Sequence, residues 1–415
     1  MRLVPIPTSE YESYRLDLMF DCYKWDPQFL DNNTVARYAL VITEDEHREL
    51  VKLTEALDRE TRISEQFLNK HQELTKPLKL TKKLLKDIKL MTDYNPDKHI
   101  RLTRYDFHPV TDVEGGWAIS EVNSDVPGGF AEASLMPGVA MRYLDNPGRH
   151  TPYYFTSFGD KMVEAVKSKV RAGGRIMLLH CTCYSDDRQV MQFLGDRLTS
   201  EGYSIIYGAV DHVNFKNKKA YSILDGNEGE LDAVFRFTPL EWFPDIKPKK
   251  WQGYFNTEAV SCNHPVAIYA QTKRFPCVWD VLEKNGISMS TWRRLLPNTL
   301  EARAVSDRED FIYKPAYGRV GEGITIREAL EITEYEKIMK DVKRHPSRFV
   351  AQKKFSSRPL MGEDGKAYHI CLGSYAIDGE HGGYYARIST TPRIDSGAAD
   401  IPVLIEADEK SKSFE

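Results

Sequence analysis

The spacing of apolar residues near the start of the chain is typical of amphipathic helices. Thr43-Glu-Asp-Glu46 has the pattern of a capping box, in which the Thr and Glu side chains accept hydrogen bonds from free backbone N–H groups at the beginning of a helix. Apolar residues follow at helical spacing: Leu50, Leu53 and Leu57. A second helix is expected near 78–91. We therefore predict that residues 1 to about 95 are mainly helical.

Residues 100–125 change to a period of two, which indicates strands. Two expected strands, 99–108 and 117–123, flank the turn-like segment 112–116, which ends in two glycines. The pattern therefore predicts a β-hairpin that follows the helical region.

A parallel sheet is predicted in the middle of the chain. Gly173-Gly174 precedes the apolar run 175–180, which has the length of a buried strand. A helix is expected over 187–200 and a second strand over 203–207, and these elements make a βαβ unit. Residues 231–237 are a further strand candidate.

From about residue 276 a third segment mixes strands with one helix. The expected elements are strands 311–315, 349–353, 368–378 and 382–391 and a helix over 334–343. We expect an α/β (α+β) fold in three parts. Residues 1–150 would form the helical region with the hairpin, residues 151–275 a Rossmann-like domain, and residues 276–415 the last part.

Composition narrows the possible functions. The 415 residues are too many for one hydrophobic core, and the net charge of −4 without a basic tract argues against nucleic acid as a partner. The Leu- and Lys-rich stretch 79–89 is expected to be a solvated helix face.

No apolar run is long enough to span a membrane, and no secretory signal is expected. Six cysteines do not suggest a disulfide framework, so we expect a cytoplasmic protein. Cys181-Thr-Cys183 lacks zinc-knuckle spacing and is expected to end a buried strand.

Four polar side chains of the hairpin could share one face. Residues i and i+2 of a strand point the same way, so Arg104 pairs with Asp106 and Glu121 with Asn123. If the turn centres between positions 113 and 114 and the strands have no bulge, Asp106 lies opposite Glu121 and Arg104 opposite Asn123. Two opposed carboxylates repel, and a divalent cation would relieve this. Oxygen ligands suit Mg²⁺. The alternative is a solvated polar face with an Arg–Glu pair.

A glycine-rich turn follows a strand that carries Lys314. Glycines at positions 318, 321 and 323 would let backbone N–H groups approach a phosphate, to which Lys314 adds a positive charge. The turn matches neither the Walker A loop nor the dinucleotide fingerprint. An ordinary hairpin turn would have a similar sequence, and both interpretations stay open at this point.

These features together resemble the glutathionylspermidine synthase family, whose synthetase domain has an ATP-grasp fold. The resemblance lies in ordered blocks across most of the chain. The blocks are Cys22-Tyr-Lys-Trp-Asp-Pro27, Arg104-Tyr-Asp106 with Glu121-Val-Asn123, Leu231 to Trp242, Lys314-Pro with Gly318-Arg-Val-Gly321, Gln352, and Gly373 to Asp378 with Ala386-Arg387. The resemblance implies an ATP-grasp fold in which the Rossmann-like domain is an embedded pre-ATP-grasp domain.

The resemblance also implies roles for individual residues. Asp106, Glu121 and Asn123 would coordinate Mg²⁺, and Arg104 and Arg387 would stabilise the transferred phosphoryl group and an acyl-phosphate. The residues expected at ATP are Lys314, Lys273, Gln352 and the lid turn with Gly318, Arg319, Gly321 and Gly323. Two departures affect the expected substrate rather than the ATP site: Ile-Ser follows Arg387 where the family has Glu, and Glu322 precedes Gly323. The amidase domain of bifunctional members is not expected.

The implied activity is an ATP- and Mg²⁺-dependent carboxylate–amine ligase that works through an acyl-phosphate. Its substrates would be a small-molecule or peptide carboxylate and an amine; glutathione and spermidine are the precedents in the family. Asp125 and Glu132 could receive a cationic amine, although a surface role is the simpler interpretation. A small-molecule kinase and a nucleotide-binding protein without turnover are the alternatives.

Overall fold

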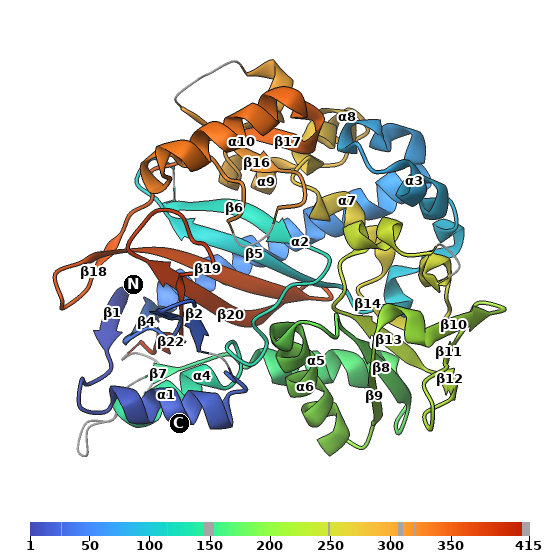
Figure 1. Ribbon diagram of the computed structural model, residues 1–415, viewed down its shortest axis with the longest axis horizontal. Coiled ribbons are helices and arrows are strands. Elements are labelled where there is room, and N and C mark those ends of the chain that lie inside the picture. Colours follow the sequence, from blue (N-terminus) through green and yellow to red (C-terminus); the bar gives the residue numbers. More distant parts are fainter. Residues whose placement is uncertain are drawn as a thin grey trace.

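The computed structural model describes residues 1–25, 27–113, 115–144, 153–247, 250–305, 310–318 and 321–408. An antiparallel sheet at the centre joins strands from distant parts of the chain (Figure 1). Its order is β21 (Ala399–Ile401), β20 (Glu380–Ser389), β19 (Ala367–Ile377), β5 (Leu102–Pro109) and β6 (Trp117–Asn123), and β18 (Leu360–Met361) pairs with β19 outside this order. The predicted hairpin, β5 and β6, therefore shares a sheet with strands near the other end of the chain.

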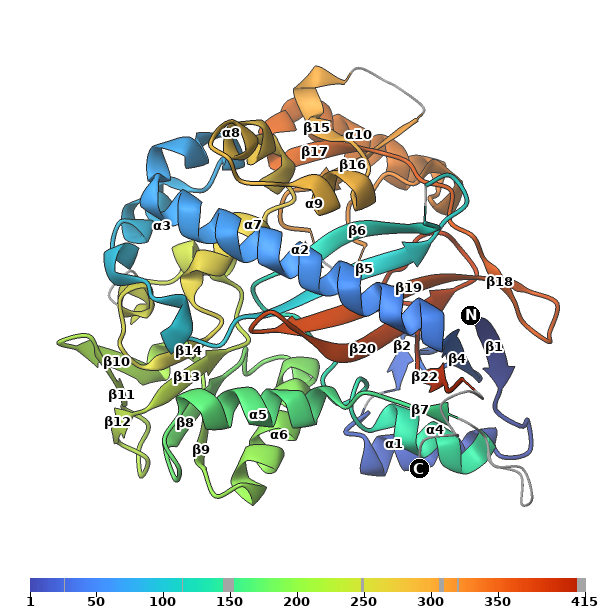
Figure 2. The same cartoon turned by 180° about the vertical axis from the view of Figure 1, so that it is seen from behind.

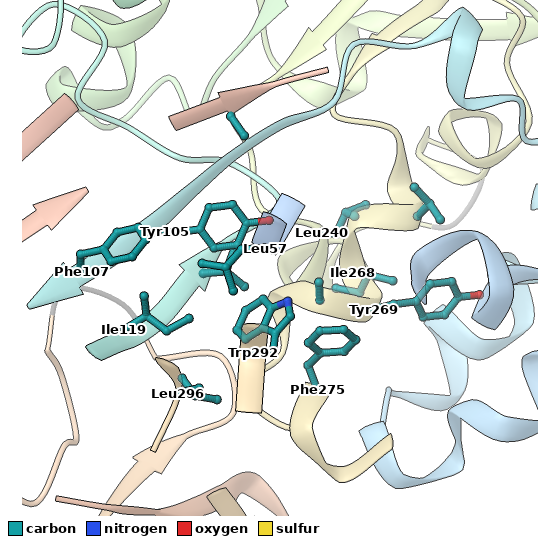
Figure 3. Close-up of a cluster of buried hydrophobic side chains, with 14 of the residues drawn as sticks. Leu57, Tyr105, Phe107, Ile119, Leu240, Ile268, Tyr269, Phe275, Trp292 and Leu296 are labelled. Atoms are coloured by element: carbon teal, nitrogen blue, oxygen red, sulfur yellow. The ribbon is translucent and has the colours of Figure 1, made fainter. Parts of the chain in front are cut away.

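Helix α2 (Glu44–Lys70) crosses one face of the central sheet (Figure 2). The predicted capping box is present: Glu46 N–H donates to Thr43 Oγ1 at 3.2 Å, and Thr43 N–H donates to Glu46 Oε2 at 2.9 Å. Figure 3 shows Leu57 of this helix beside Tyr105 of β5, within the main hydrophobic core. The apolar stripe of α2 thus covers the sheet face opposite the polar side chains.

The first residues of the chain are not mainly helical, contrary to the prediction. They form β1 (Arg2–Pro5), α1 (Tyr11–Asp21), β2 (Gln28–Phe29), β3 (Asn32–Asn33) and β4 (Tyr38–Thr43). Residues 38–42 are a continuous buried apolar run, which suits a strand covered on both faces. β4 pairs with β1 and with β22 (Val403–Glu406), which in turn pairs with β7 (Tyr153–Tyr154). The predicted second helix is shorter, α3 (Lys82–Ile88), with 3₁₀ turns on both sides.

The hairpin has the predicted pairs, Arg104 with Asn123 and Asp106 with Glu121. The assumption of no bulge is wrong, because Phe107 pairs with Ile119 and Ser120 is left as an extra residue. The bulge moves Ile119 into the core with Phe107 while Glu121 keeps the polar face. Figure 3 shows Phe107 and Ile119 among the buried side chains.

The predicted βαβ unit is confirmed in a parallel sheet of order β14-β13-β8-β9. Its elements are β8 (Arg175–Leu179), α6 (Ser185–Ser200), β9 (Ser204–Gly208), β13 (Ala233–Arg236) and β14 (Val260–Cys262), preceded by α4 (Met136–Leu144) and α5 (Phe158–Lys169). Cys181 and Cys183 follow the end of β8, as expected. A small antiparallel sheet is inserted after β9: β10 (Val213–Lys216), β11 (Lys219–Ser222) and β12 (Gly229–Leu231).

A sheet in the last part of the chain, which we call the third sheet, has the order β15 (Thr299–Glu301), β17 (Phe349–Lys353) and β16 (Phe311–Pro315). Helix α10 (Ile332–Arg344) covers its outer face, where Tyr313 and Phe349 pack against Met339 and Val342. The alternate residues of these strands, including Lys314 and Gln352, belong to the opposite face. The short helices α7 (Ile268–Gln271), α8 (Trp279–Lys284) and α9 (Ser290–Leu295) connect the parallel sheet to this one.

Within the described residues, no helix combines the length and the apolar character needed to cross a membrane.

We predict that Thr43→Ala lowers the free energy of unfolding by about 1 kcal/mol, because the first turn of α2 loses its side-chain acceptor. Urea unfolding measures this change. Thr43→Ser keeps the acceptor and serves as the matched control. Equal losses in the two variants would contradict a capping role for the hydroxyl.

Candidate active site

Asp106 on β5 is held by polar neighbours on the open face of the central sheet. Arg104 donates to both of its oxygens, Nε to Oδ1 at 2.8 Å and Nη2 to Oδ2 at 3.1 Å. Asn123 Nδ2 donates to Oδ2 at 3.0 Å from the neighbouring strand. Asp106 is buried, so the two donors together fix its carboxylate.

The carboxylate of Glu121 is neutralised from outside the sheet. Lys273 Nζ lies 3.0 Å from Glu121 Oε2. Burial alone would raise the pKa of Glu121, but the ammonium groups of Lys273 and Lys314 outweigh it and hold the pKa below its ordinary value. The repulsion expected between the two opposed carboxylates is therefore relieved by protein cations: Arg104 at Asp106, and the lysines at Glu121. The simpler alternative, a solvated face with an Arg–Glu pair, is wrong because these groups are mostly buried and Arg104 pairs with Asp106.

The donor set of the hairpin suits a hard cation. Asp106, Glu121 and Asn123 offer oxygen atoms only, which is the chemistry that Mg²⁺ prefers. No group of three or more His, Cys, Asp or Glu side chains placed to hold a metal occurs among the described residues. Two carboxylates and one amide fit Mg²⁺, which usually keeps few protein ligands and completes its shell with phosphate oxygens and water.

The guanidinium of Arg104 lies across β19 at a glycine. A Cβ atom on Gly373 would come within 2.6 Å of Arg104 Cδ, so the strand needs a residue without a side chain there. Arg104 Nη1 donates to Gly128 O at 2.9 Å, and its guanidinium carbon lies 4.9 Å from the ring centre of Tyr385. These contacts hold the guanidinium in one orientation above the sheet.

Lys314 reaches the hairpin from the third sheet. Its Nζ donates to the carbonyl oxygen of Ser120 at 3.0 Å. Burial lowers the pKa of Lys314 to about 8; Lys273 adds to this effect and Glu121 opposes it. Ser120 Oγ also lies 3.0 Å from Nε2 of His108, whose pKa burial and Lys314 lower to about 4. The imidazole is therefore neutral at physiological pH, and its Nε2 can accept a hydrogen bond from the Ser120 hydroxyl.

Lys273 joins the glycine-rich turn to the hairpin. Its Nζ donates to Gly318 O at 2.6 Å while it pairs with Glu121. Gly321 has φ of +70°, and a Cβ atom there would lie 2.9 Å from Ile394 O. Gly323 also has a positive φ, of +66°. The turn is thus adjacent to Lys273, whereas Arg319, the remaining predicted residue of the lid, lies outside the described residues.

Gln352 lies at a pocket beside Glu121 and Lys273. The pocket has a volume of about 310 Å³, part of it open to solvent, and its wall includes the apolar side chains of Phe275 and Trp292. Gln352 Nε2 donates to Thr299 Oγ1 at 3.1 Å. Its Oε1 is buried and has no hydrogen-bond partner within the described part of the chain. The predicted residue therefore lines the same pocket as Glu121 and Lys273.

Arg387 occupies the same sheet face two strands away from the hairpin. It pairs across β20 and β19 with Cys371 and across β20 and β21 with Asp400. Its Nε lies 3.7 Å from Asp400 Oδ1, and it also donates to carbonyl oxygens of the segment 395–398. The sheet thus brings Arg104 and Arg387 to one face, but each is paired with its own carboxylate.

A family model described as "Glutathionylspermidine synthase preATP-grasp" matches residues 16–406 of this sequence. The chain belongs to the glutathionylspermidine synthase family. Membership of this synthase family supports an ATP-dependent ligase. The predicted α/β fold of ATP-grasp type, with an embedded Rossmann-like domain, is confirmed.

Comparison with solved structures finds one protein of similar fold and one weaker likeness. A glutathione synthetase-like effector from Globodera pallida, in its apo form, is 12% identical and aligns over 96% of this chain and 98% of its own, with a TM-score of 0.62. At this identity the likeness concerns the fold alone. A putative gamma-glutamylcysteine synthetase from Methylobacillus flagellatus is 14% identical over 84% of this chain and 88% of its own, with a TM-score of 0.46. A search of curated proteins finds no match.

A surface role was expected for Asp125 and Glu132, but both are paired with other side chains in this member of the glutathionylspermidine synthase family. Asp125 is buried against Arg236, which donates to both of its carboxylate oxygens. Glu132 lies 3.4 Å from Lys24 and accepts from Gln189 at 3.3 Å. Burial of charge requires such partners, so Asp125 belongs to the interior framework and is not available to an incoming amine.

Sequence reasoning did not assign Lys24, Tyr385 or Asp400 to the site. Lys24 Nζ lies 2.5 Å from Asp400 Oδ2, and Tyr385 OH donates to Asp400 Oδ1 at 2.7 Å. Lys24 lies inside the aromatic block 22–27 that carried part of the resemblance, so its position was a usable signal. Asp400 stands near the other end of the chain, and no local pattern connects the two.

We predict that Gly373→Ala displaces Arg104 and lowers ATP turnover by about 100-fold, because a small misplacement of a positioning group is costly. Steady-state ADP release measures the change. Gly138→Ala in helix α4 is the matched control, because a Cβ there would meet only the ring of Phe155, at an ordinary contact distance of 3.5 Å. Activity in Gly373→Ala equal to that of the control would contradict the packing argument.

We predict that ATP affinity falls as pH rises above about 8, because Lys314 then loses its proton. Burial lowers its pKa from 10.5 to about 8, so the ammonium is present below this pH and is lost above it. Titration calorimetry at pH 7 and pH 9 should show a loss of about tenfold. Lys314→Arg stays charged and should bind equally at both pH values. A parallel loss in the arginine variant would assign the effect to another group.

Proposed function

We propose that this protein is an ATP- and Mg²⁺-dependent ligase that joins a carboxylate to an amine through an acyl-phosphate. The observation that carries the proposal is the meeting of two sheets: Lys314 and Lys273 arrive from one side at Glu121, which lies on the same face as Arg104 and Asp106. Clustered cations with oxygen ligands match the needs of phosphoryl transfer, which depends on positioning and charge neutralisation.

The mechanism assigns each group a task. Lys314 and Lys273 would bind ATP phosphates, with the turn of Gly318, Arg319, Gly321 and Gly323 above them. Gln352 would face the nucleotide through its unpaired Oε1. Mg²⁺ held by Asp106, Glu121 and Asn123 would neutralise charge on the phosphate oxygens.

The two arginines would act on the reacting groups. Arg104, already oriented by Gly128 and Asp106, would meet the transferred phosphoryl group, and Arg387 the acyl-phosphate that results. The carboxylate oxygen would attack the γ-phosphorus of ATP, and ADP would leave. The amine nitrogen would then attack the carbonyl carbon of the acyl-phosphate, and phosphate would leave and take up the proton that the amine loses. The turn beside Lys273 would exclude water, which would otherwise hydrolyse the acyl-phosphate. We propose a small-molecule or peptide carboxylate and an amine as the substrates.

We predict that Glu121→Gln and Asp106→Asn each lower Mg²⁺-dependent ADP release by at least about 100-fold while the fold persists. A coupled ADP assay gives the rate, and circular dichroism checks folding. Glu164→Gln, an exposed carboxylate far from the site in helix α5, is the control. Full activity in either site variant would reject the metal-ligand assignment.

A screen of amino acids, peptides and polyamines tests the ligase activity itself. ADP release that requires both an acid and an amine, with an amide product seen by mass spectrometry, is the expected result. A stable phosphorylated product without an amide would indicate a small-molecule kinase instead. Nucleotide binding without ADP release across the screen would indicate a binding protein.

A further inference from the structure

The extra residue in β6 is not needed for the fold of the hairpin. Phe107 pairs with Ile119 on the core side, and Asp106 pairs with Glu121 on the polar side. Without Ser120, Ile119 and Glu121 would be consecutive, and consecutive residues of a regular strand point to opposite faces. A strand that lacked Ser120 would therefore keep the same pairs and the same faces. The bulge must be explained by what Ser120 itself contacts.

Among the described residues, two side chains form hydrogen bonds with Ser120, and both are chemically active. Its carbonyl oxygen accepts from Lys314 Nζ at 3.0 Å. Its hydroxyl lies 3.0 Å from Nε2 of His108, on the neighbouring strand. Lys314 and His108 are both buried, and Phe355 packs at 5.1 Å between ring centres against the imidazole. β6 is the edge strand of the central sheet, and the bulge interrupts its ladder with β5 at Ser120, whose carbonyl oxygen accepts from Lys314 instead.

This carbonyl is the point where Lys314 contacts the central sheet. Lys314 belongs to β16 of the third sheet, and Ser120 to β6 of the central sheet. The carboxylate next to it, Glu121, already has Lys273 at 3.0 Å. A hydrogen bond from a charged donor is strong and directional, so the Ser120 carbonyl can fix the position of the Lys314 ammonium. Glu121 alone would fix it less well, because its carboxylate is also paired with Lys273.

We propose that the bulged residue Ser120, held by His108, is a positioning residue that fixes the Lys314 ammonium at the junction of the two sheets. The proposal rests on the proposed function in one respect: the ammonium so placed is the one that would meet an ATP phosphate. The bulge then serves phosphate binding, and the regular ladder on each side of it serves the fold.

Deletion of Ser120 tests the proposal directly. The deletion should keep the fold, because every strand pair and face is preserved, but it removes the acceptor of Lys314. The KM for ATP should rise about tenfold with little change in kcat, the effect of one charge-assisted hydrogen bond. The Nζ signal of Lys314 in the ¹⁵N-lysine NMR spectrum, assigned by its absence in Lys314→Arg, should shift or disappear. A folded deletion variant with an unchanged signal and unchanged KM would overturn the proposal.

A double-mutant cycle keeps the test decisive if the deletion does not fold. Ser120→Ala and His108→Phe each remove the same hydrogen bond but leave the bulge carbonyl in place. Each should raise the KM for ATP about threefold, and the double variant should do no worse than either single one. Additive effects would overturn the role of His108. The Lys314 signal reports the geometry without ATP, so a wild-type protein that turns over no ATP would reject the proposed function while this inference is still decided by NMR.

Discussion

The site depends on the neutralisation of two opposed carboxylates by protein cations, one from the hairpin itself and one from outside it. Asp106 and Glu121 face each other across a buried pair of strands, an arrangement that costs stability unless opposite charge is close. Arg104 forms an ion pair with Asp106 from the same strand, and Lys273 forms one with Glu121 from a segment far along the chain. Because Lys273 also bonds Gly318, the glycine-rich turn is held against the hairpin by the same charge.

This arrangement gives the site its polarity before any ligand arrives. The lysines that lower the pKa of Glu121 are the residues that a polyphosphate would attract. When a nucleotide and its metal ion bind, the phosphates would replace Glu121 as the partners of the lysines. The metal ion would replace the lysines as the partner of the Glu121 carboxylate. Such an exchange keeps every buried charge paired, which is the condition for charge in a dry interior.

Local patterns in the sequence predicted many of the elements, but they missed the strands β1 to β4 and the true length of α3. The capping box at Thr43, the βαβ unit and the pairing of Asp106 with Glu121 all follow from spacing alone. The bulge was not predicted, although the change from apolar Ile119 to polar Glu121, two residues apart and so on one face of a regular strand, was a signal that could have indicated it. The partners of Glu121 and Asp400 were not readable, because Lys273 and Lys24 meet them only through the packing of distant segments.

The parallel sheet contributes to the site through one buried segment that follows β6. Asp125 is clamped by Arg236 of β13 and accepts from the backbone of Leu240 at 2.9 Å. Gln271 lies two residues before Lys273 in the chain. Its Oε1 accepts from the N–H groups of Ser124 and Asp125, both at 2.8 Å. These bonds tie the end of the hairpin to the Rossmann-like domain and to the segment that delivers Lys273. The carboxylate strand and the segment that carries its neutralising lysine are thus fixed to one framework.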